Sequence, residues 1–367
     1  PRTKGKLMDR RKFLTTAGVG TAAATLAAPS IARAQTISWK MTTAFPPGQP
    51  FYSTGPGSLT DFTDRVREMS SGALDITVYH GGELVPAFEG FDAVRQGIVE
   101  MNGWVSYFGA GKVPAAQFFG AVPFGMSTQG QNAWFYVGDG IDLWNETYEP
   151  LGLVAMPIGA TGVQMTGWFN KEINSIEDMQ GLRMRIPGLA AKAYARVGVD
   201  VKLLPGGEIF PALERGVIDA AEWVGPAQDK ILGLNTAAKY YYTTGWHEPT
   251  TVTELAINKA AWDTLSGELQ AIVTNAAAAC NVISHSWAEA NNAAALKEFE
   301  ANGTELRVLP DDVIEALKVE MGPVYDELAS EDPQFKKVMD NYFAFKAEHD
   351  IWAGASEQVW HSQLRSA

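Results

Sequence analysis

The sequence predicts an α/β protein built from two similar lobes, and three observations support this prediction. The chain has 367 residues, 46% of them hydrophobic, which is more than one typical domain requires. A strand–helix–strand pattern opens its main part, as in the βαβ units of α/β folds. A helix–glycine–strand segment at Ala93–Val105 is repeated 119 residues later at Ala212–Val224.

The opening unit can be placed residue by residue. An alternating run at Ile37–Met41 predicts a strand, and Leu74–Val78 predicts a second one. Between them, apolar residues at spacings of three and four predict a helix over Leu59–Met69 with one apolar face. Gly72 follows this helix and is expected to end it.

The repeat carries the prediction of two lobes. Each copy contains the end of a short helix, a capping glycine and a strand that ends in Trp-Val. Upstream, Gly81–Glu83 matches Gly206–Glu208, at a separation that differs by six residues from that of the repeat. Two matches in the same order predict two similarly built lobes, and a cleft between such lobes is a favoured place for a small ligand.

The segment between the two copies and the one after them continue the α/β pattern. Val163–Phe169 and Leu182–Ile186 read as strands, and Ser175–Met179 reads as a short helix with a capping-box start. A further extended run, Thr250–Asn258, is expected to return the chain across a hinge. From Trp262 onward the sequence predicts mostly helix.

A heptad-like seam predicts one long helix near the end of the chain. Its apolar and aromatic positions are spaced 3, 4, 3, 4 and 3 residues apart. They are Phe335, Val338, Tyr342, Phe345, His349 and Trp352. Such a seam packs either against the protein's own lobes or against a partner helix in a homodimer, and the sequence leaves both open.

The first 34 residues differ from the rest and predict an export signal. From Met8, a basic patch with the pair Arg10-Arg11 is followed by the uncharged stretch Thr15–Ala28 and an A-x-A site at Ala32–Ala34. This layout is typical of a secretory signal of the twin-arginine type. We therefore expect residues 1–34 to be a leader and the remainder to be exported by the twin-arginine route.

Charge and cysteine content exclude several functions. The formal net charge is −13, and without residues 1–34 the chain keeps 22 basic and 41 acidic residues, a net charge of −19. Nucleic acids and anionic membrane surfaces repel such a protein. The single cysteine, Cys280, excludes an internal disulfide framework, a CxxC redox pair and a cysteine-based zinc site.

Catalytic motifs are missing. The five histidines show no H-x-x-x-H spacing, no G-x-S-x-G elbow occurs, and Gly109–Lys112 lacks the spacing of a phosphate loop. A carboxylate pair stays possible because acids are numerous. The sequence therefore favours binding over catalysis.

A distinctive string connects the chain to a known family. Gly206–Trp223, together with the preceding Leu182–Gly188, resembles the solute-binding proteins of tripartite ATP-independent periplasmic (TRAP) transporters, the DctP-type family. Three further segments look closest to its 2-oxo acid and lactate binders: Gly162–Gln164, Glu222–Pro226 and Trp246–Pro249. The resemblance covers the whole chain after the leader.

The resemblance implies a periplasmic protein with a two-lobed periplasmic-binding-protein fold, type II-like, with hinge-crossing strands and a long C-terminal helical region. Residues 35–160 and about 253–310 would form lobe I, and residues 161–252 would form lobe II. Residues 311–367 would pack on both lobes or on a partner.

It also implies a binding site. Arg185 would pair with the substrate carboxylate, since a guanidinium presents two parallel N–H donors that match both carboxylate oxygens. The metal ligands would be Gln164, Glu222, the backbone carbonyl of Trp223 and Glu248. These oxygen donors suit Na⁺ or Ca²⁺ rather than zinc or copper, and no organic cofactor is implied.

The expected ligand is a small 2-oxo or 2-hydroxy monocarboxylate of the pyruvate, lactate and 2-oxobutyrate class, delivered to the membrane permease of a TRAP transporter. Aromatic side chains would supply an apolar wall: Trp223, Trp104, Tyr107, Phe124 and Phe45. Two alternatives stay open. One is a periplasmic α/β enzyme acting on a carboxylate with Glu222 as general base. The other is a receptor that serves sensing.

Overall fold

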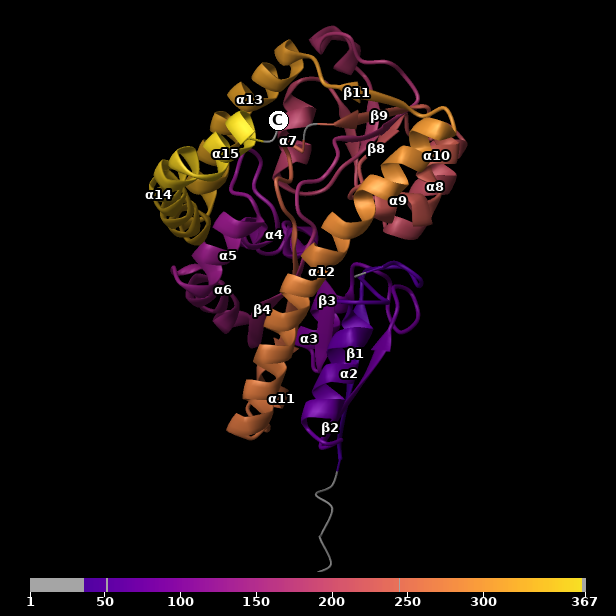
Figure 1. Ribbon diagram of the computed structural model, residues 1–367. Helices are drawn as coiled ribbons and strands as arrows, with labels where there is room; N and C mark the ends of the chain where they lie inside the picture. Colours follow the sequence, from indigo (N-terminus) through magenta and orange to yellow (C-terminus); the bar gives the residue numbers. More distant parts are fainter. Residues whose placement is uncertain (1–35, 51, 244, 365–367) are drawn as a thin grey trace, which may run out of the picture. The chain divides into compact units, whose positions relative to one another are not determined.

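The computed structural model describes residues 36–50, 52–243 and 245–364, which form two β-sheets and the helices around them (Figure 1). The leader predicted at residues 1–34 lies outside this part of the chain. Within the described residues, no helix combines the length and the hydropathy needed to cross a membrane.

The first sheet has five strands in the order β2-β1-β3-β10-β4. Their bounds are β1 Ile37–Thr43, β2 Leu74–Tyr79, β3 Met101–Trp104, β4 Leu153–Ala160 and β10 Val252–Asn258. β1 is parallel to β2 and β3, whereas β10 is antiparallel to β3 and β4. Helix α2 (Leu59–Met69) connects β1 to β2, and Ser58 caps its start, which confirms the strand–helix–strand unit predicted from the sequence.

The second sheet has six strands in the order β11-β9-β5-β8-β6-β7. Their bounds are β5 Gly167–Phe169, β6 Arg183–Arg185, β7 Asp200–Lys202, β8 Ala220–Ala221, β9 Tyr240–Thr243 and β11 Glu305–Val308. The strand β11 pairs in parallel with β9. Residues 305–308 therefore belong to the second sheet and not to lobe I, where the predicted division at about residue 310 had placed them.

The two copies of the sequence repeat have equivalent structures. Helix α3 (Gly90–Arg95) leads through Gly97 into β3, and helix α8 (Gly206–Glu214) leads through Gly216 into β8. Both glycines are left-handed, with φ of 70° and 67°. β3 and β8 each lie between one parallel and one antiparallel neighbour. The prediction of two similarly built α/β halves is confirmed.

The upstream match is not structurally equivalent. Gly206–Glu208 begins helix α8, whereas Gly81–Glu83 lies in a turn several residues before α3. Both segments nevertheless line one cavity of about 430 Å³ together with Pro46 and Pro205.

The chain passes between the two sheets twice through residues that later form the site. Residues 161–166 lead from β4 to β5, and residues 245–251 lead into β10 after β9. This agrees with the predicted return of the chain at Thr250–Asn258. Helix α12 (Gly267–Ala301) runs diagonally past both halves, contacting β4 and α2 of the first and α9 (Pro226–Leu232) of the second (Figure 1).

The C-terminal helices are α13 (Asp311–Glu331), α14 (Pro333–Ala355) and α15 (Glu357–Leu364). Glu320 of α13 pairs with Arg196 of α7 (Gly188–Arg196) at 2.6 Å. In α14 the first three residues of the predicted seam, Phe335, Val338 and Tyr342, are buried, and the Tyr342 hydroxyl accepts a hydrogen bond from the Met126 amide at 2.9 Å. The first half of the seam therefore packs on the protein itself.

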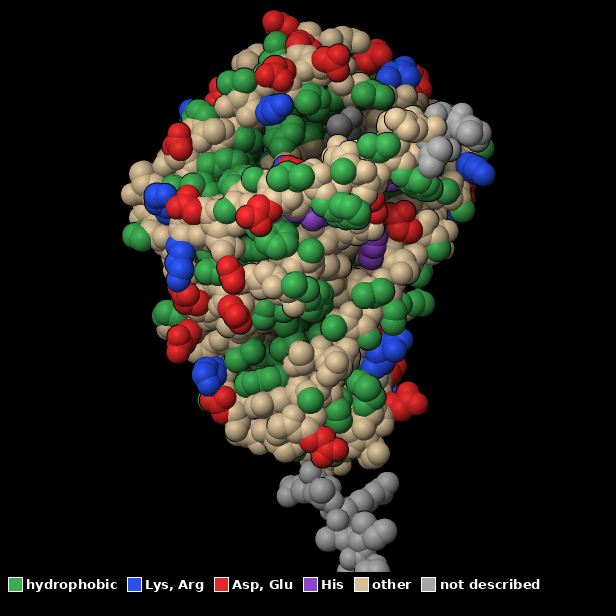
Figure 2. Space-filling view, turned by 60° about the vertical axis from the view of Figure 1, so that its left-hand side comes forward, with side chains coloured by type: hydrophobic (Ala, Val, Ile, Leu, Met, Phe, Trp, Pro, Cys, Tyr) green, Lys and Arg blue, Asp and Glu red, His purple; other side chains and the backbone are tan. Residues whose placement is uncertain are grey.

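The remaining helices cover the two sheets. They are η1 Ser106–Gly109, η2 Pro114–Ala116, α4 Gln117–Gly120, α5 Thr128–Tyr136, α6 Gly140–Tyr148, η3 Glu149–Leu151, η4 Ile176–Met179, α10 Leu234–Ala237 and α11 Lys259–Trp262. On the face seen in Figure 2, the Lys and Arg side chains lie singly among acidic and apolar ones and form no continuous basic patch.

Candidate functional site

The site begins at the carboxyl ends of two adjacent parallel strands of the second sheet. Arg185 is the last residue of β6, and Glu222 directly follows β8. Arg185 Nη1 donates to Glu222 Oε2 at 2.8 Å and to the Glu222 carbonyl at 2.7 Å, while the Glu222 amide donates to the Arg185 carbonyl at 3.0 Å. Both side chains are almost completely buried, so this is an ion pair held away from solvent.

A second arginine on the same strand has a different role. Arg183 forms a surface pair with Asp219, with Nη2 and Oδ1 2.7 Å apart, and its side chain is 41% exposed. Of the two arginines on β6, Arg185 is therefore the one that lies inside the protein, as a carboxylate-binding arginine in a closed site must.

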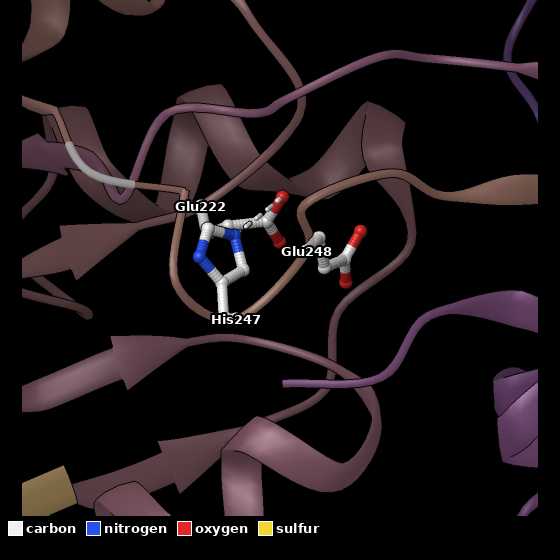
Figure 3. A group of neighbouring side chains, drawn as sticks. All are labelled: Glu222, His247 and Glu248. Atoms are coloured by element: carbon white, nitrogen blue, oxygen red, sulfur yellow. Dashed lines mark ion pairs between the residues drawn. The ribbon is translucent and has the colours of Figure 1, made fainter. Parts of the chain in front are cut away.

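The segment that leads into β10 supplies two further side chains. Glu222, His247 and Glu248 each offer one ligand atom, and these atoms all lie within 4.8 Å of one another. The imidazole of His247 points toward the Glu222 carboxylate, with Nε2 and Oε1 3.9 Å apart (Figure 3). Glu248 accepts hydrogen bonds from the hydroxyls of Tyr107, at 3.5 Å, and Thr251. All three are buried, and together they form a compact group of potential metal ligands.

Burial disfavours the charged forms of Glu222, His247 and Glu248. It raises the pKa of Glu222 to about 8, although Arg185 acts in the opposite direction. Burial, together with the charge of Glu222, raises the pKa of Glu248 to about 8. Burial lowers the pKa of His247 to about 4, so its imidazole is neutral at pH 7 with a lone pair available. A bound cation would favour the ionised carboxylates and would find a neutral imidazole beside them.

Several buried polar atoms in this region have no hydrogen-bond partner among the described residues. They are Gln164 Oε1, Glu222 Oε1, Trp223 Nε1 and both ring nitrogens of His247. Gln164 donates its Nε2 to the Thr251 hydroxyl at 2.8 Å, which leaves its carbonyl oxygen available. Unsatisfied buried polar atoms are rare and cost roughly 1–3 kcal/mol each. Their concentration around Glu222 fits a bound cation and a polar ligand, and the oxygen donors are those that Na⁺ and Ca²⁺ prefer.

Aromatic rings enclose one side of the site. The guanidinium of Arg185 lies 5.4 Å from the ring centre of Trp223. Tyr52 meets Trp223 edge to face at 6.0 Å and stacks on Phe45 at 3.8 Å. The negative charges of Glu248 and Glu222 contribute to the raised pKa of the Tyr52 hydroxyl after burial, which places this ring next to the acidic group.

Most of the side chains predicted from the sequence are brought together. Six lie in or directly beside the group of buried ligands: Gln164, Arg185, Glu222, Trp223, Glu248 and Tyr107. Phe45 reaches Trp223 only through Tyr52.

Two predicted wall residues lie elsewhere. The indole of Trp104 donates to Glu254 at 2.7 Å and stacks on Phe91 in a hydrophobic core. Phe124 packs on Trp246 at 5.2 Å and donates its amide to the carbonyl of that residue. Phe124 is therefore one layer behind His247 rather than at the ligand group.

The positions of His247 and Tyr52 at the site were not predicted from the sequence. His247 belongs to the segment Trp246–Pro249, which resembles the 2-oxo acid and lactate binders. Its place next to Glu248, a predicted metal ligand, is the feature of the sequence that could have indicated a role. Tyr52 follows a Pro/Gly-rich loop with no periodic pattern, so nothing in the sequence indicated its position.

Two α/β halves joined by two crossing segments, with a buried arginine and a converging group of buried donors and acceptors that lack partners, define a receptor for a small anionic solute. A family model described as bacterial extracellular solute-binding protein, family 7 (DctP), matches residues 50–332. The chain belongs to this family, the solute-binding proteins of TRAP transporters.

Individual relatives are similar to this chain over nearly its whole length. A monocarboxylate 2-oxoacid-binding periplasmic protein of Nostoc sp. is 40% identical over 367 residues, covering 98% of this chain and 100% of that protein. Among solved structures, a TRAP solute-binding protein of Colwellia psychrerythraea with bound calcium and pyruvate has a TM-score of 0.86 at 35% identity. The alignment covers 90% of this chain and 100% of that one.

Two further structures have similar scores. A TRAP solute-binding protein of Pseudoalteromonas atlantica with bound sodium and pyruvate has a TM-score of 0.85 at 34% identity and covers 90% of this chain and 100% of its own. One from Bordetella bronchiseptica has a TM-score of 0.87 at 33% identity, with 90% and 98% coverage. It is a mixed-occupancy dimer with calcium and picolinate in one site and an apo second site.

These relatives confirm the class that the sequence predicted. The two-sheet α/β fold matches TRAP solute-binding proteins, which are periplasmic receptors and not enzymes. The alternative of an enzyme with Glu222 as general base is therefore not supported.

Proposed function

We propose that this protein is the receptor of a TRAP transporter for a small 2-oxo or 2-hydroxy monocarboxylate, which it binds together with Na⁺ or Ca²⁺. Relatives that bind pyruvate with calcium or sodium support this proposal. The observation that carries it is the buried group around Glu222, where unsatisfied oxygen and nitrogen atoms converge beside a buried arginine.

Arg185 and the cation would recognise different parts of the ligand. Nε and Nη1 of Arg185 are engaged with the carbonyls of Leu204 and Glu222 and with the Glu222 carboxylate, so Nη2 is the group proposed to meet the ligand carboxylate. Gln164, Glu222, the Trp223 carbonyl and Glu248 would hold the cation. A 2-oxo acid chelates a cation through one carboxylate oxygen and the neighbouring oxygen, which an acid without that group cannot do.

Isothermal titration calorimetry on the purified protein tests the proposal. Pyruvate should bind in Ca²⁺ buffer and lose most of its affinity after treatment with EDTA in sodium-free buffer. Restoring either Na⁺ or Ca²⁺ then identifies the cation. Equal affinity with and without any metal would remove the cation from the site.

Acetate and propionate are the matched control ligands because they carry the carboxylate but no 2-oxo oxygen. We expect both to bind far more weakly than pyruvate in the presence of the metal. A series from pyruvate to 2-oxobutyrate and 2-oxovalerate then measures the chain length that the aromatic wall accepts. Acetate binding as tightly as pyruvate would contradict the proposed mode of recognition.

We also propose that the end of α14 and the helix α15 form a homodimer interface. Their apolar side chains are exposed, with Ile351 76%, Trp352 68% and Trp360 51% accessible. Large apolar groups gathered on one surface indicate an interaction site. The dimer of the Bordetella bronchiseptica relative supports a second copy of this chain as the partner.

Analytical ultracentrifugation tests the dimer with a pair of variants. Trp352→Glu should shift the protein to monomer without loss of folding, because the side chain is exposed. Val137→Glu, at a position that is 88% exposed outside these helices, should leave the assembly unchanged. A monomeric wild-type protein would refute the interface.

Export by the twin-arginine route is proposed on the sequence alone, since residues 1–34 lie outside the described part of the chain. Replacing Arg10 and Arg11 with lysine should retain the precursor in the cytoplasm, as measured by cell fractionation. Normal export of this variant would contradict the proposed route.

A further inference from the structure

A third buried acid, Asp229, lies behind the site and takes no part in the proposed ligand set. It belongs to α9 and its side chain is completely buried. Its Oδ2 accepts hydrogen bonds from Trp168 Nε1 at 2.9 Å and from the Tyr241 hydroxyl at 2.8 Å. Its Oδ1 accepts one from the backbone amide of Val224 at 3.0 Å. Three donors therefore converge on one carboxylate in the core of the second lobe.

The bond to Val224 determines where the carbonyl of the preceding residue points. The N–H of Val224 and the C=O of Trp223 belong to the same planar peptide unit, and no peptide bond described in the structure is cis. In a trans peptide the two groups point in opposite directions. Because the N–H points at Asp229, the Trp223 carbonyl points away from Asp229.

The backbone on either side of this peptide is held as well. The amide and carbonyl of Glu222 are hydrogen-bonded to Arg185, and the Val224 carbonyl accepts from the Met165 amide at 2.9 Å. Among the described residues no donor is hydrogen-bonded to the Trp223 carbonyl. It is the one carbonyl of residues 222–224 left to a ligand.

We propose that Asp229 is a positioning residue of the cation site, fixing the Trp223–Val224 peptide so that the Trp223 carbonyl is presented to the metal. A carboxyl oxygen that accepts the N–H also polarises the peptide and makes its carbonyl oxygen a better cation ligand. This inference rests on the proposed function, because it assumes that the Trp223 carbonyl is a metal ligand. Groups behind the direct ligands commonly change metal affinity by about 10–100-fold when they are removed.

The competing explanation is a structural role alone, as a satisfied buried acid near the start of α9. Two variants separate the explanations. Asp229→Ala removes the acceptor of the Val224 amide, whereas Tyr241→Phe removes one partner of the same carboxylate and leaves that amide bonded. If only stability depends on this group, both variants lower the melting temperature and neither changes Ca²⁺ affinity.

Calorimetry with Ca²⁺ alone provides the first measurement. We expect Asp229→Ala to weaken Ca²⁺ binding by about 10–100-fold and Tyr241→Phe to change it by less than about threefold. Equal losses in the two variants, or no loss in a folded Asp229→Ala protein, overturn the inference. If Asp229→Ala does not fold, Asp229→Leu replaces it with the same outcomes, because leucine fills a similar space and has no acceptor for the Val224 amide.

Selective labelling gives a second readout on the wild-type protein. Labelling Trp with carbonyl ¹³C and Val with ¹⁵N marks only Trp-Val peptides, of which the sequence has two, at residues 104–105 and 223–224. Ca²⁺ should shift the carbonyl signal of Trp223 and leave that of Trp104, in a hydrophobic core, as the internal reference.

The outcomes separate this inference from the function on which it rests. If calorimetry detects Ca²⁺ binding but the Trp223 signal does not move, the positioning role is wrong and the metal site stands. If wild-type protein binds neither Ca²⁺ nor Na⁺, the proposed cation site fails and the inference fails with it. A Ca²⁺-induced shift that is lost in the Asp229 variant supports both.

Discussion

Replacing Arg185 with methionine is the most direct test of the site. Methionine keeps much of the side-chain length but removes every donor, and Arg185 is only 1% exposed, so no other surface role is lost. A hydrogen bond to a charged group contributes roughly 1.5–3 kcal/mol, so losing the one proposed from Nη2 to the ligand carboxylate weakens the pyruvate Kd by about 10–10²-fold.

The effect on folding should be smaller than the effect on binding. Arg185 is the partner of Glu222, and leaving a buried charge unpaired is ordinarily severe. Here Arg185 is the group that lowers the pKa of Glu222, so in its absence burial raises this pKa further and the unpaired acid is protonated at pH 7 instead of charged. The variant should therefore fold, and circular dichroism and thermal unfolding verify this before any titration.

The matched control is Arg183→Met, two residues upstream on the same strand. Arg183 pairs with Asp219 at the surface, so this variant loses an arginine, a positive charge and an ion pair without touching the site. Pyruvate titrations in Ca²⁺ buffer should show an intact Kd for Arg183→Met and a Kd weakened by about 10–10²-fold for Arg185→Met. Retained affinity in folded Arg185→Met, or an equal loss in both variants, would refute the assignment of Arg185.

Three further outcomes are expected. Burial raises the pKa of Glu254 to about 7, so between its ordinary value and pH 7 the unfolded chain binds fewer protons and stability falls as pH rises. This contribution is up to about 3 kcal/mol, and Glu222 and Glu248, whose pKa values burial also raises, add to the fall in both proteins. Between pH 5 and 8, urea unfolding should therefore show stability falling by up to about 3 kcal/mol less in Glu254→Gln than in the wild-type protein, and an equal fall in both would contradict this. Trp104→Phe, which loses the donor to Glu254, should lower the melting temperature and leave pyruvate affinity unchanged, whereas weaker binding would return Trp104 to the ligand wall. Gly206→Ala would place a methyl group 2.6 Å from the Trp223 ring at a cost of about 1–3 kcal/mol, so it should weaken pyruvate binding more than Gly207→Ala, whose position is open; titrations that rank the two variants equally would contradict it.

Local patterns in the sequence predicted the fold where each pattern is satisfied by near neighbours. The β1–α2–β2 unit follows from alternation, helical spacing and a glycine, all within about forty residues. The strand β11 was not predicted, because it is four residues long, only partly buried and set between long helices. Its pairing with β9 joins segments more than sixty residues apart, and no local pattern contains that information.

The site was predictable in its charged residues and less so in its aromatic ones. Arg183 and Arg185 lie two residues apart on one strand and have the same side-chain chemistry, so the sequence does not tell which one binds a ligand. In the structure Arg185 is buried and Arg183 is exposed. A tryptophan is expected to be buried somewhere, but which core it enters depends on the partner of its ring N–H. For Trp104 that partner is Glu254, which lies 150 residues further along the chain.

The two copies of the repeat explain why only one half carries the ligands. At the position equivalent to Glu222, the first copy has Gly103, and a Cβ there would lie 2.5 Å from the side chain of Leu59. Helix α2 therefore fills the space that a carboxylate would need. The next residue in each copy is a tryptophan. The indole of Trp104 finds Glu254 in a core, whereas that of Trp223 lies beside Arg185 with no acceptor among the described residues. Equivalent strands in the two sheets thus border a closed core in the first half and a set of available ligand atoms in the second. The side chains packed against the equivalent positions cause this difference.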